Sequence, residues 1–98
     1  MSIKALIKRT VPQDKARNML HLFMEMRTLA TAQPGYISGE TMKSIEKPDE
    51  YLVISTWESA DDWEKWMLSK ERQVIQRKID ALLGGKTTYE IFQYGLRG

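Results

Sequence analysis

One histidine and a few carboxylates are the side chains of this 98-residue sequence that could move a proton near neutral pH. Histidine is the only residue type whose ordinary pKa lies near neutrality, which makes His21 the first candidate for a general base. His21 is one position away from the apolar stripe of its predicted helix, and this phase favours the rim of a pocket or solvent. The carboxylate candidates are Asp62, Glu40 and Glu90, and the sequence alone does not choose among them.

Aromatic and sulfur-containing side chains could line a pocket for a flat apolar molecule. The candidates are Phe23, Met26, Trp57, Trp66 and Met67. Residues of these types at helical spacing are more often part of a hydrophobic core, so core packing is the alternative interpretation.

Two polar residues could contact a bound substrate. Arg9 follows Ile3, Ala5 and Ile7 at a period of two and therefore shares their strand face, from which it could steady an anionic ligand. A salt bridge at the strand end is the alternative for this arginine. Tyr36 could donate a hydrogen bond to a substrate oxygen, or it could fill the edge of the sheet.

Length and composition place the chain among single-domain globular proteins, and we treat residues 1–98 as one domain. Hydrophobic residues make up 42% and charged residues 29%, which argues against intrinsic disorder. There is no cysteine and one histidine, so we expect no metal site and no disulfide. The net charge of +2 is too small to predict binding to nucleic acid or to a membrane surface.

The first ten residues, MSIKALIKRT, interrupt their apolar positions with lysines. This pattern contains neither the apolar core of a signal peptide nor a membrane-spanning segment. We therefore expect a cytoplasmic protein.

Hydrophobic periodicity predicts four strands and two helical regions. Alternation indicates strands over residues 3–10, 36–44, 51–57 and 87–94, and steps of three and four indicate helices over 13–33 and 59–83. A change of phase near Ser69 predicts a kink or two short helices. Gly84 and Gly85 predict a left-handed helix end, and the charged residues between 70 and 80 predict a solvated helix face.

The element order βαββαβ predicts an α+β, ferredoxin-like fold, with a four-stranded antiparallel sheet and two helices on one face. Strands three and four carry apolar residues on both faces, whereas the helices cover only one. Because monomers seldom expose a large apolar patch, we expect the open sheet face to bury itself against a second copy, giving a homodimer.

Several segments resemble the antibiotic biosynthesis monooxygenase family. They are QPGYISGET at residues 33–41, PDEYLVISTWES at residues 48–59, and the helical Trp63 and Trp66. The resemblance covers nearly the whole chain and implies a dimeric α/β barrel. It also implies a cofactor-independent monooxygenase that acts on a phenolic, quinol or polyketide-like aromatic molecule, although the superfamily includes haem-degrading enzymes and members of no known activity.

Compared residue by residue, the resemblance carries over Trp66 and departs from the family pattern at the other positions considered. Trp66 falls where the family has a helix tryptophan that projects toward the pocket. The haem-degrading branch has a histidine ten residues after this tryptophan and an asparagine on the first strand. Here Gln76 replaces the histidine and the first strand has no asparagine, which disfavours haem degradation. The quinone-forming branch has an asparagine one turn before the tryptophan, where this chain has Asp62.

Three functions follow as hypotheses. The first is an oxygenase without metal or flavin, with Trp66, His21 and Asp62 as catalytic candidates and Arg9, Phe23, Tyr36, Trp57 and Met67 as substrate-binding candidates. The second is a non-catalytic dimeric barrel that binds a small apolar ligand in an accessory or stress role. The third is a nucleic-acid-binding sheet, which the small net charge and the apolar open face disfavour.

Overall fold

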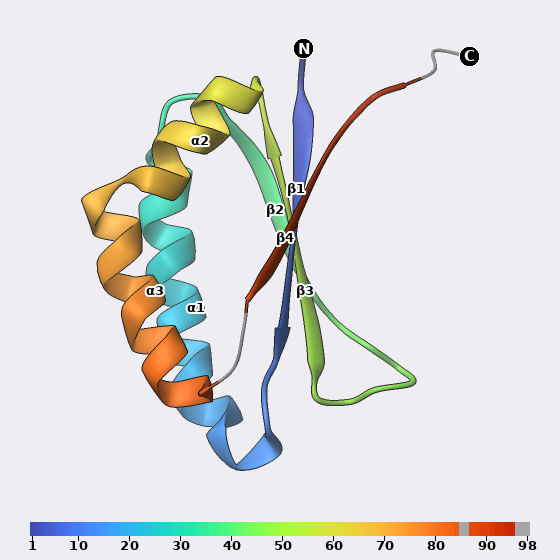
Figure 1. Cartoon of the computed structure of the whole chain (residues 1–98), viewed down its shortest axis with the longest axis vertical. Coiled ribbons are helices and arrows are strands. Elements are labelled where there is room, and N and C mark those ends of the chain that lie inside the picture. Colours follow the sequence, from blue (N-terminus) through green and yellow to red (C-terminus); the bar gives the residue numbers. More distant parts are fainter. Residues whose placement is uncertain (85–86, 96–98) are drawn as a thin grey trace.

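The computed structural model describes residues 1–84 and 87–95 and contains the expected order of elements (Figure 1). The second helical region is two helices, as the change of phase near Ser69 predicts. The elements are β1 Ile3–Thr10, a 3₁₀ turn η1 Gln13–Lys15, α1 Ala16–Thr31, β2 Tyr36–Lys43, β3 Glu50–Trp57, α2 Ala60–Leu68, α3 Lys70–Leu83 and β4 Thr88–Gln93.

The four strands form one antiparallel sheet in the order β2-β3-β1-β4. The three α-helices lie on one side of it, and none of the described helices covers the other side, which we call the uncovered face (Figure 1). The ferredoxin-like prediction is therefore confirmed. Ala5 is opposite Ser55 on β3 and Ile91 on β4, and this register sets which side chains face the helices.

Two serines fix where the second helical region begins and bends. The hydroxyl of Ser59 accepts a hydrogen bond from the Asp62 backbone N–H at the start of α2. Ser69 is extended and ends α2, and its hydroxyl accepts from the Arg72 backbone N–H to start α3. Gly84 ends α3 in the left-handed region at φ 62°, as predicted, while Gly85 lies outside the described residues.

The core lies between the sheet and the helices and has two parts. One joins the buried face of β1 to Trp57 on β3 and to the α2 tryptophans Trp63 and Trp66. The other joins α1 to α3 through Met19, Ile75 and Ile79. The site described below lies beside the first part, where aromatic side chains meet the sheet.

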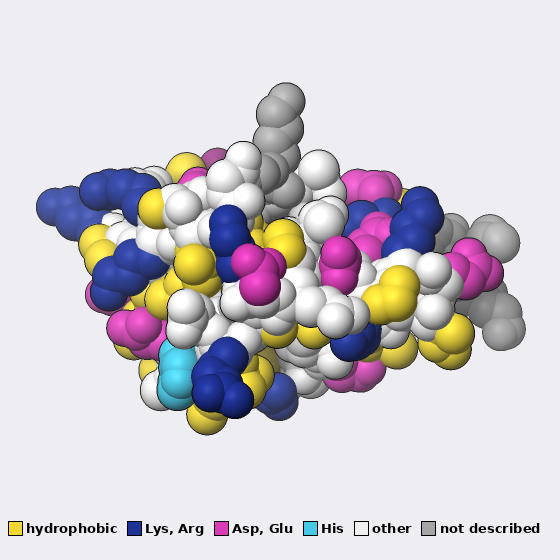
Figure 2. All heavy atoms as spheres, turned by 90° about the horizontal axis from the view of Figure 1, so that it is seen from below, with side chains coloured by type: hydrophobic (Ala, Val, Ile, Leu, Met, Phe, Trp, Pro, Cys, Tyr) yellow, Lys and Arg dark blue, Asp and Glu magenta, His cyan; other side chains and the backbone are white. Residues whose placement is uncertain are grey.

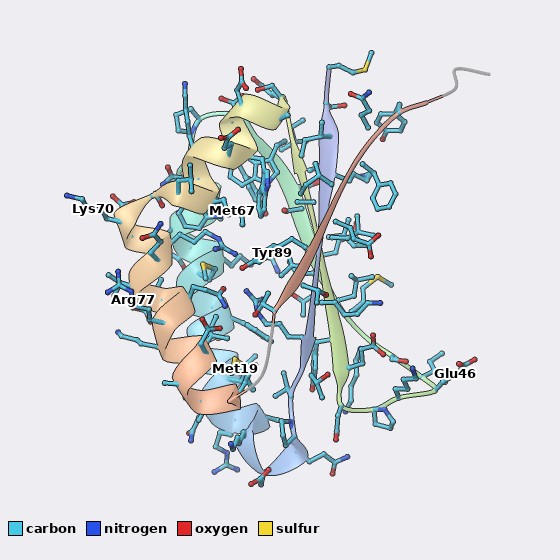
Figure 3. All side chains as sticks on the ribbon, viewed as in Figure 1. Met19, Glu46, Met67, Lys70, Arg77 and Tyr89 are labelled. Carbon is cyan, nitrogen blue, oxygen red and sulfur yellow. The ribbon has the colours of Figure 1, made fainter. Side chains whose placement is uncertain are left out.

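The uncovered face of the sheet mixes apolar and charged side chains. Alternation along the strands places Leu6, Leu52, Ile54 and Phe92 on this face, together with Lys4, Lys8 and Glu90. Phe92 is exposed, and Ile45 in the β2–β3 loop is 96% exposed. The loop projects away from the sheet on the side opposite the helices, as Glu46 near its tip shows (Figure 3).

Side chains of both charge signs are spread over the face shown in Figure 2. None of the described helices is long and apolar enough to cross a membrane. The prediction of a wholly solvated charged face between residues 70 and 80 is wrong at one position: Arg72 is 3% exposed, because it lies three and seven positions before the buried Ile75 and Ile79 and so shares their side of α3.

Candidate functional site

A cavity of about 60 Å³ lies between the inner face of the sheet and the helices. It receives side chains from β1, β2, β3 and all three α-helices. The lining residues are Ile7, Arg9, Phe23, Met26, Arg27, Ala30, Tyr36, Gly39, Glu40, Thr41, Val53, Ser55, Trp57, Trp63, Trp66 and Arg72.

Tryptophans form one wall of the cavity. Trp57 and Trp66 are stacked, with ring centroids 6.5 Å apart and planes inclined by 23°. Tyr36 packs edge-on against Trp57 at 5.4 Å, and the Trp57 indole N–H donates to the Ser55 hydroxyl at 3.0 Å. The stack and its hydrogen bond hold a flat, rigid surface against which a planar molecule can pack.

Arg9 brings a buried positive charge to the cavity. Its side chain donates from Nη2 to Gln76 Oε1 at 3.0 Å and from Nε to Thr87 Oγ1 at 3.3 Å, and its guanidinium lies 5.3 Å from the centroid of the Phe23 ring. Burial is the main cause that lowers the pKa of Arg9 to about 10; the charge of Arg72 acts in the same direction, and Tyr89 and Asp80 act in the opposite one. Arg9 is therefore a buried cation at neutral pH.

Arg72 brings a second buried positive charge to the cavity. Its guanidinium lies over the rings of Trp63 and Tyr89, at 5.8 and 5.3 Å from their centroids, and Nη2 donates to the Tyr89 hydroxyl at 2.9 Å. Tyr89 projects from β4 toward the helices (Figure 3). The Nε atom of Arg72 is buried and has no hydrogen-bond partner among the described residues.

Neither arginine has a carboxylate counter-ion in the described part of the chain, where the one salt bridge joins Lys8 to Glu50 on the surface. The strand-end salt bridge considered for Arg9 is thus wrong; its partners are neutral. Two buried cations without a paired anion lower the stability of a folded chain, and such an arrangement is typical of a site that binds an anion. No group of three or more metal-binding side chains occurs among the described residues.

The cavity opens between α1 and β2, where its lining residues Arg27, Glu40 and Thr41 are exposed. Arg27 crosses this mouth and donates to the Gly39 carbonyl oxygen at 3.4 Å. Glu40 pairs with Ile54 in the sheet, so alternation directs its side chain to the uncovered face. Glu40 therefore lines the mouth without turning its carboxylate into the cavity, and no other residue of the described lining carries a carboxylate.

Five of the eight predicted site residues line this cavity: Arg9, Phe23, Tyr36, Trp57 and Trp66. The other three lie elsewhere. His21 is exposed on α1, and Met67 packs against the core without lining the cavity. The Asp62 carboxylate accepts a hydrogen bond from the Ser59 hydroxyl at 2.9 Å, which gives it a place in the cap of α2.

Arg72, the residue that most changes the chemistry of the cavity, was not among the residues predicted from the sequence. Because Arg72 is charged, we assigned it to the predicted solvated face between residues 70 and 80. Its spacing to Ile75 and Ile79 indicates the buried side of the helix instead. Ser55 was missed as well, because a small hydroxyl inside an apolar strand carries no sign of the neighbour that it binds.

Comparison with protein families gives one match over most of the chain. Residues 2–78 match the family model described as "Antibiotic biosynthesis monooxygenase". Two curated relatives are Protein SchA of Streptomyces halstedii, 25% identical over 85% of this chain, and the 42.8 kDa protein in the whiE locus of Streptomyces coelicolor, 28% identical over 70%. The aligned regions are 22% and 17% of those proteins, so the chain matches about a fifth of their length.

Solved structures share the fold at low sequence identity. A conserved protein from Methanosarcina mazei has a TM-score of 0.87 at 16% identity, covering 95% of this chain and 92% of that one. SnoaB from Streptomyces nogalater, described as a cofactor-independent oxygenase, has a TM-score of 0.84 at 16% identity, covering 98% and 95%.

Proposed function

Because the chain belongs to the antibiotic biosynthesis monooxygenase family, we propose that it is a cofactor-independent monooxygenase that inserts oxygen into a phenolic or quinol ring. The observation that carries the proposal is a pair of buried arginines, neither in a salt bridge among the described residues, that line the same cavity as the stacked Trp57 and Trp66. A phenolate supplies both what the arginines lack, a negative charge, and what the tryptophans can pack against, a flat ring.

The chemistry requires an electron-rich anion. A phenol loses its O–H proton, and the phenolate passes one electron to O₂; the two radicals then join, forming a carbon–oxygen bond at the para carbon. The resulting peroxide anion takes up one proton, which balances the proton released by the phenol. The hydroperoxide then loses water, together with the hydrogen on the para carbon, and gives the quinone. Phenol plus O₂ thus yields quinone plus water, with one oxygen atom in the product and the other in water.

Arg9 and Arg72 take the main role in this scheme. Fixed positive charge in a site of low dielectric favours the phenolate over the phenol, so ionisation does not depend on a base inside the cavity. The proton leaves to solvent through the mouth between α1 and β2. The wall formed by Trp57 and Trp66 orients the ring and excludes bulk water from the radical pair.

The free space favours a small ring. A cavity of about 60 Å³ holds a few water molecules and is smaller than the dry cavity of about 150 Å³ that is known to enclose benzene. Entry of even one ring therefore requires side chains at the mouth to move. Met26 and Arg27 are the unbranched, flexible side chains there, so we place this adjustment on them.

Oxygen uptake by chelator-treated protein tests the proposal. The substrates are phenols with a free para position, hydroquinones and anthrones, with boiled protein as the blank. We expect uptake above the blank that falls at least tenfold in Arg9→Gln and is reduced in Trp66→Phe. His21→Gln is the control and keeps the wild-type rate, since His21 is exposed outside the cavity. Uptake that is equal in wild type and Arg9→Gln contradicts the proposal.

One observation favours a second function, a non-catalytic barrel that binds a small aromatic ligand. The described lining contains no histidine, and its one carboxylate residue, Glu40, directs its side chain to the uncovered face, so no base lies inside the cavity. Binding of a phenol without oxygen uptake across the whole panel would select this function.

We also propose that two copies associate through the uncovered face of the sheet. Leu6, Ile54 and Phe92 give this face an apolar part, while Lys4 and Glu90 give it charges of both signs. A surface that carries both signs can complement itself about a two-fold axis, which is what a homodimer requires.

Light scattering at micromolar concentration tests this association. We expect a mass of twice 11.4 kDa for the wild type, and a mass near 11.4 kDa for Phe92→Asp. The control Val74→Asp places the same charge at a similarly exposed position on α3 and stays dimeric. A wild-type mass near 11.4 kDa contradicts the association.

A further inference from the structure

The number of buried charges points beyond a simple phenol. Arg9 and Arg72 are each 3% exposed, and together they bring two positive charges to one cavity. A phenolate neutralises one of them. The other remains buried and unpaired, which is the arrangement that folded proteins avoid unless a partner arrives.

The two guanidiniums differ in what their surroundings already satisfy. Arg9 has neutral partners on two of its nitrogens, Nε and Nη2. Arg72 has a partner on Nη2 only, and its Nε is buried and unpartnered among the described residues. The Arg72 side chain is held in place between Trp63 and Tyr89, so its free donor is fixed in position before any ligand binds.

The free donor of Arg72 suits one class of anion best. A guanidinium presents its N–H groups in a planar fork that matches the two oxygens of a carboxylate. The neighbouring rings of Trp63 and Tyr89 favour an aromatic body next to that group.

We propose that the ligand of this cavity is a hydroxybenzoate-type molecule, in which a carboxylate binds Arg72 through Nε and the ring with its phenolic oxygen extends toward Arg9 and the tryptophan wall. The inference rests on the proposed function, because it names the substrate class of the same site. It adds that the substrate is an aromatic acid and that Arg72 determines this specificity.

A matched pair of ligands tests the carboxylate directly. We would compare 3-hydroxybenzoate with 3-hydroxybenzamide, which has nearly the same shape and no charge, by calorimetric titration of the full chain without oxygen. We expect the acid to bind at least tenfold more tightly than the amide, since a charge-assisted pair in a buried site is replaced by a neutral contact.

Variants of one helix separate a specific contact from general charge. Arg72→Gln should remove the preference for the acid, and Arg72→Lys should retain part of it because the charge remains without the fork. Arg77→Gln is the matched control: Arg77 is on the same helix, is exposed and points away from the sheet (Figure 3). It should leave the preference unchanged.

Three results would overturn the inference. They are equal affinity of wild type for acid and amide, a tenfold preference that survives in Arg72→Gln, and no binding of either ligand at millimolar concentration. If Arg72→Gln fails to fold, the preference of Arg72→Lys is compared with that of the wild type, and an undiminished preference in Arg72→Lys overturns the inference. Binding of the acid without oxygen uptake would support the aromatic-acid site and refute the oxygenase. Oxygen uptake with neutral phenols alone would support the oxygenase and refute the aromatic-acid site.

Discussion

The guanidinium of Arg72 lies in the same buried cavity as that of Arg9, and its charge adds to the effect of burial in lowering the pKa of Arg9 to about 10. Like charges repel strongly in an interior of low dielectric constant, and among the described residues no carboxylate pairs with either arginine. The two buried arginine charges therefore lower the stability of the ligand-free protein. This is typical of residues retained for binding.

Removal of one of these charges should not weaken the ligand-free fold. Arg72→Met keeps much of the side-chain volume over Trp63 and removes the buried charge with its unpaired Nε. We expect the free energy of unfolding in urea to stay equal or to rise by about 1 kcal/mol, because hydrophobic replacements of buried charges are often neutral or stabilising. Arg77→Met serves as the surface comparison. A loss above about 2 kcal/mol for Arg72→Met would mean that its contacts with Trp63 and Tyr89 outweigh the repulsion.

Anion binding should weaken at high pH. Because the pKa of Arg9 is lowered to about 10, its folded-state charge is complete at pH 7 and is lost as the pH rises through 10. Benzoate keeps its charge over this range, so its dissociation constant by titration should be constant from pH 7 to 9 and should increase above about 10.

The groups around Arg9 that bear on this profile are Arg72, Tyr89 and Asp80. Tyr89→Phe removes a titratable neighbour, and the decline above pH 10 should persist in that variant and vanish in Arg9→Gln. A decline in Arg9→Gln as steep as in the wild type would assign it to another group.

The lowered pKa of Arg9 also sets the sign of its effect on stability. Above pH 10 the unfolded chain, in which the pKa of Arg9 is not lowered, still holds the proton that folded Arg9 has lost. The unfolded state therefore binds more protons, and this group alone makes folding more favourable as the pH rises through that range. Relative to Arg9→Gln, the wild type should gain unfolding free energy above pH 10; a relative loss there contradicts the assignment.

The tryptophan wall should contribute both stability and binding. Trp66 is 3% exposed and stacks on Trp57, so Trp66→Ala should cost about 3–5 kcal/mol of unfolding free energy. Trp66→Phe keeps an aromatic ring there and should cost less, while it still impairs ligand affinity. A loss below about 1 kcal/mol for the alanine variant, measured by urea denaturation, would contradict the burial of this ring.

Gly35 fixes how closely α2 approaches the start of β2. Its φ is 83°, and a Cβ there would overlap the Asp62 side chain. We expect Gly35→Ala to lower the unfolding free energy by about 2 kcal/mol or more, from backbone strain and from the overlap. Gly95→Ala is the control, since nothing lies near its added Cβ, and it should melt at the wild-type temperature. Equal melting temperatures for both variants would show that the approach of α2 adjusts without cost.

The fold could be predicted from the sequence because local signals and topology agreed. The alternation in residues 3–10, the phase change at Ser69 and the glycine at 84 each correspond to the observed element. The aromatic part of the site was predictable too, since Trp57 and Trp66 carry both an apolar pattern and a family resemblance.

The electrostatic part of the site could not be predicted in the same way. Arg72 looks like one more surface charge until its phase is compared with that of Ile75, and Asp62 looks like a base until Ser59 is found to donate to it. The pairing of Arg9 with Gln76 joins residues 67 positions apart, and only the tertiary fold places them together.

The incorporation of labelled oxygen tests the central claim most directly. Metal-free protein is allowed to turn over, under ¹⁸O₂, the phenol that gives the fastest oxygen uptake, and the quinone is reduced at once to the hydroquinone before its oxygen can exchange with water. Mass spectrometry should find one ¹⁸O atom per product molecule in the wild type and at least tenfold less labelled product in Arg9→Gln. Product that contains oxygen from water alone, or labelled product formed equally by boiled protein, would contradict the account.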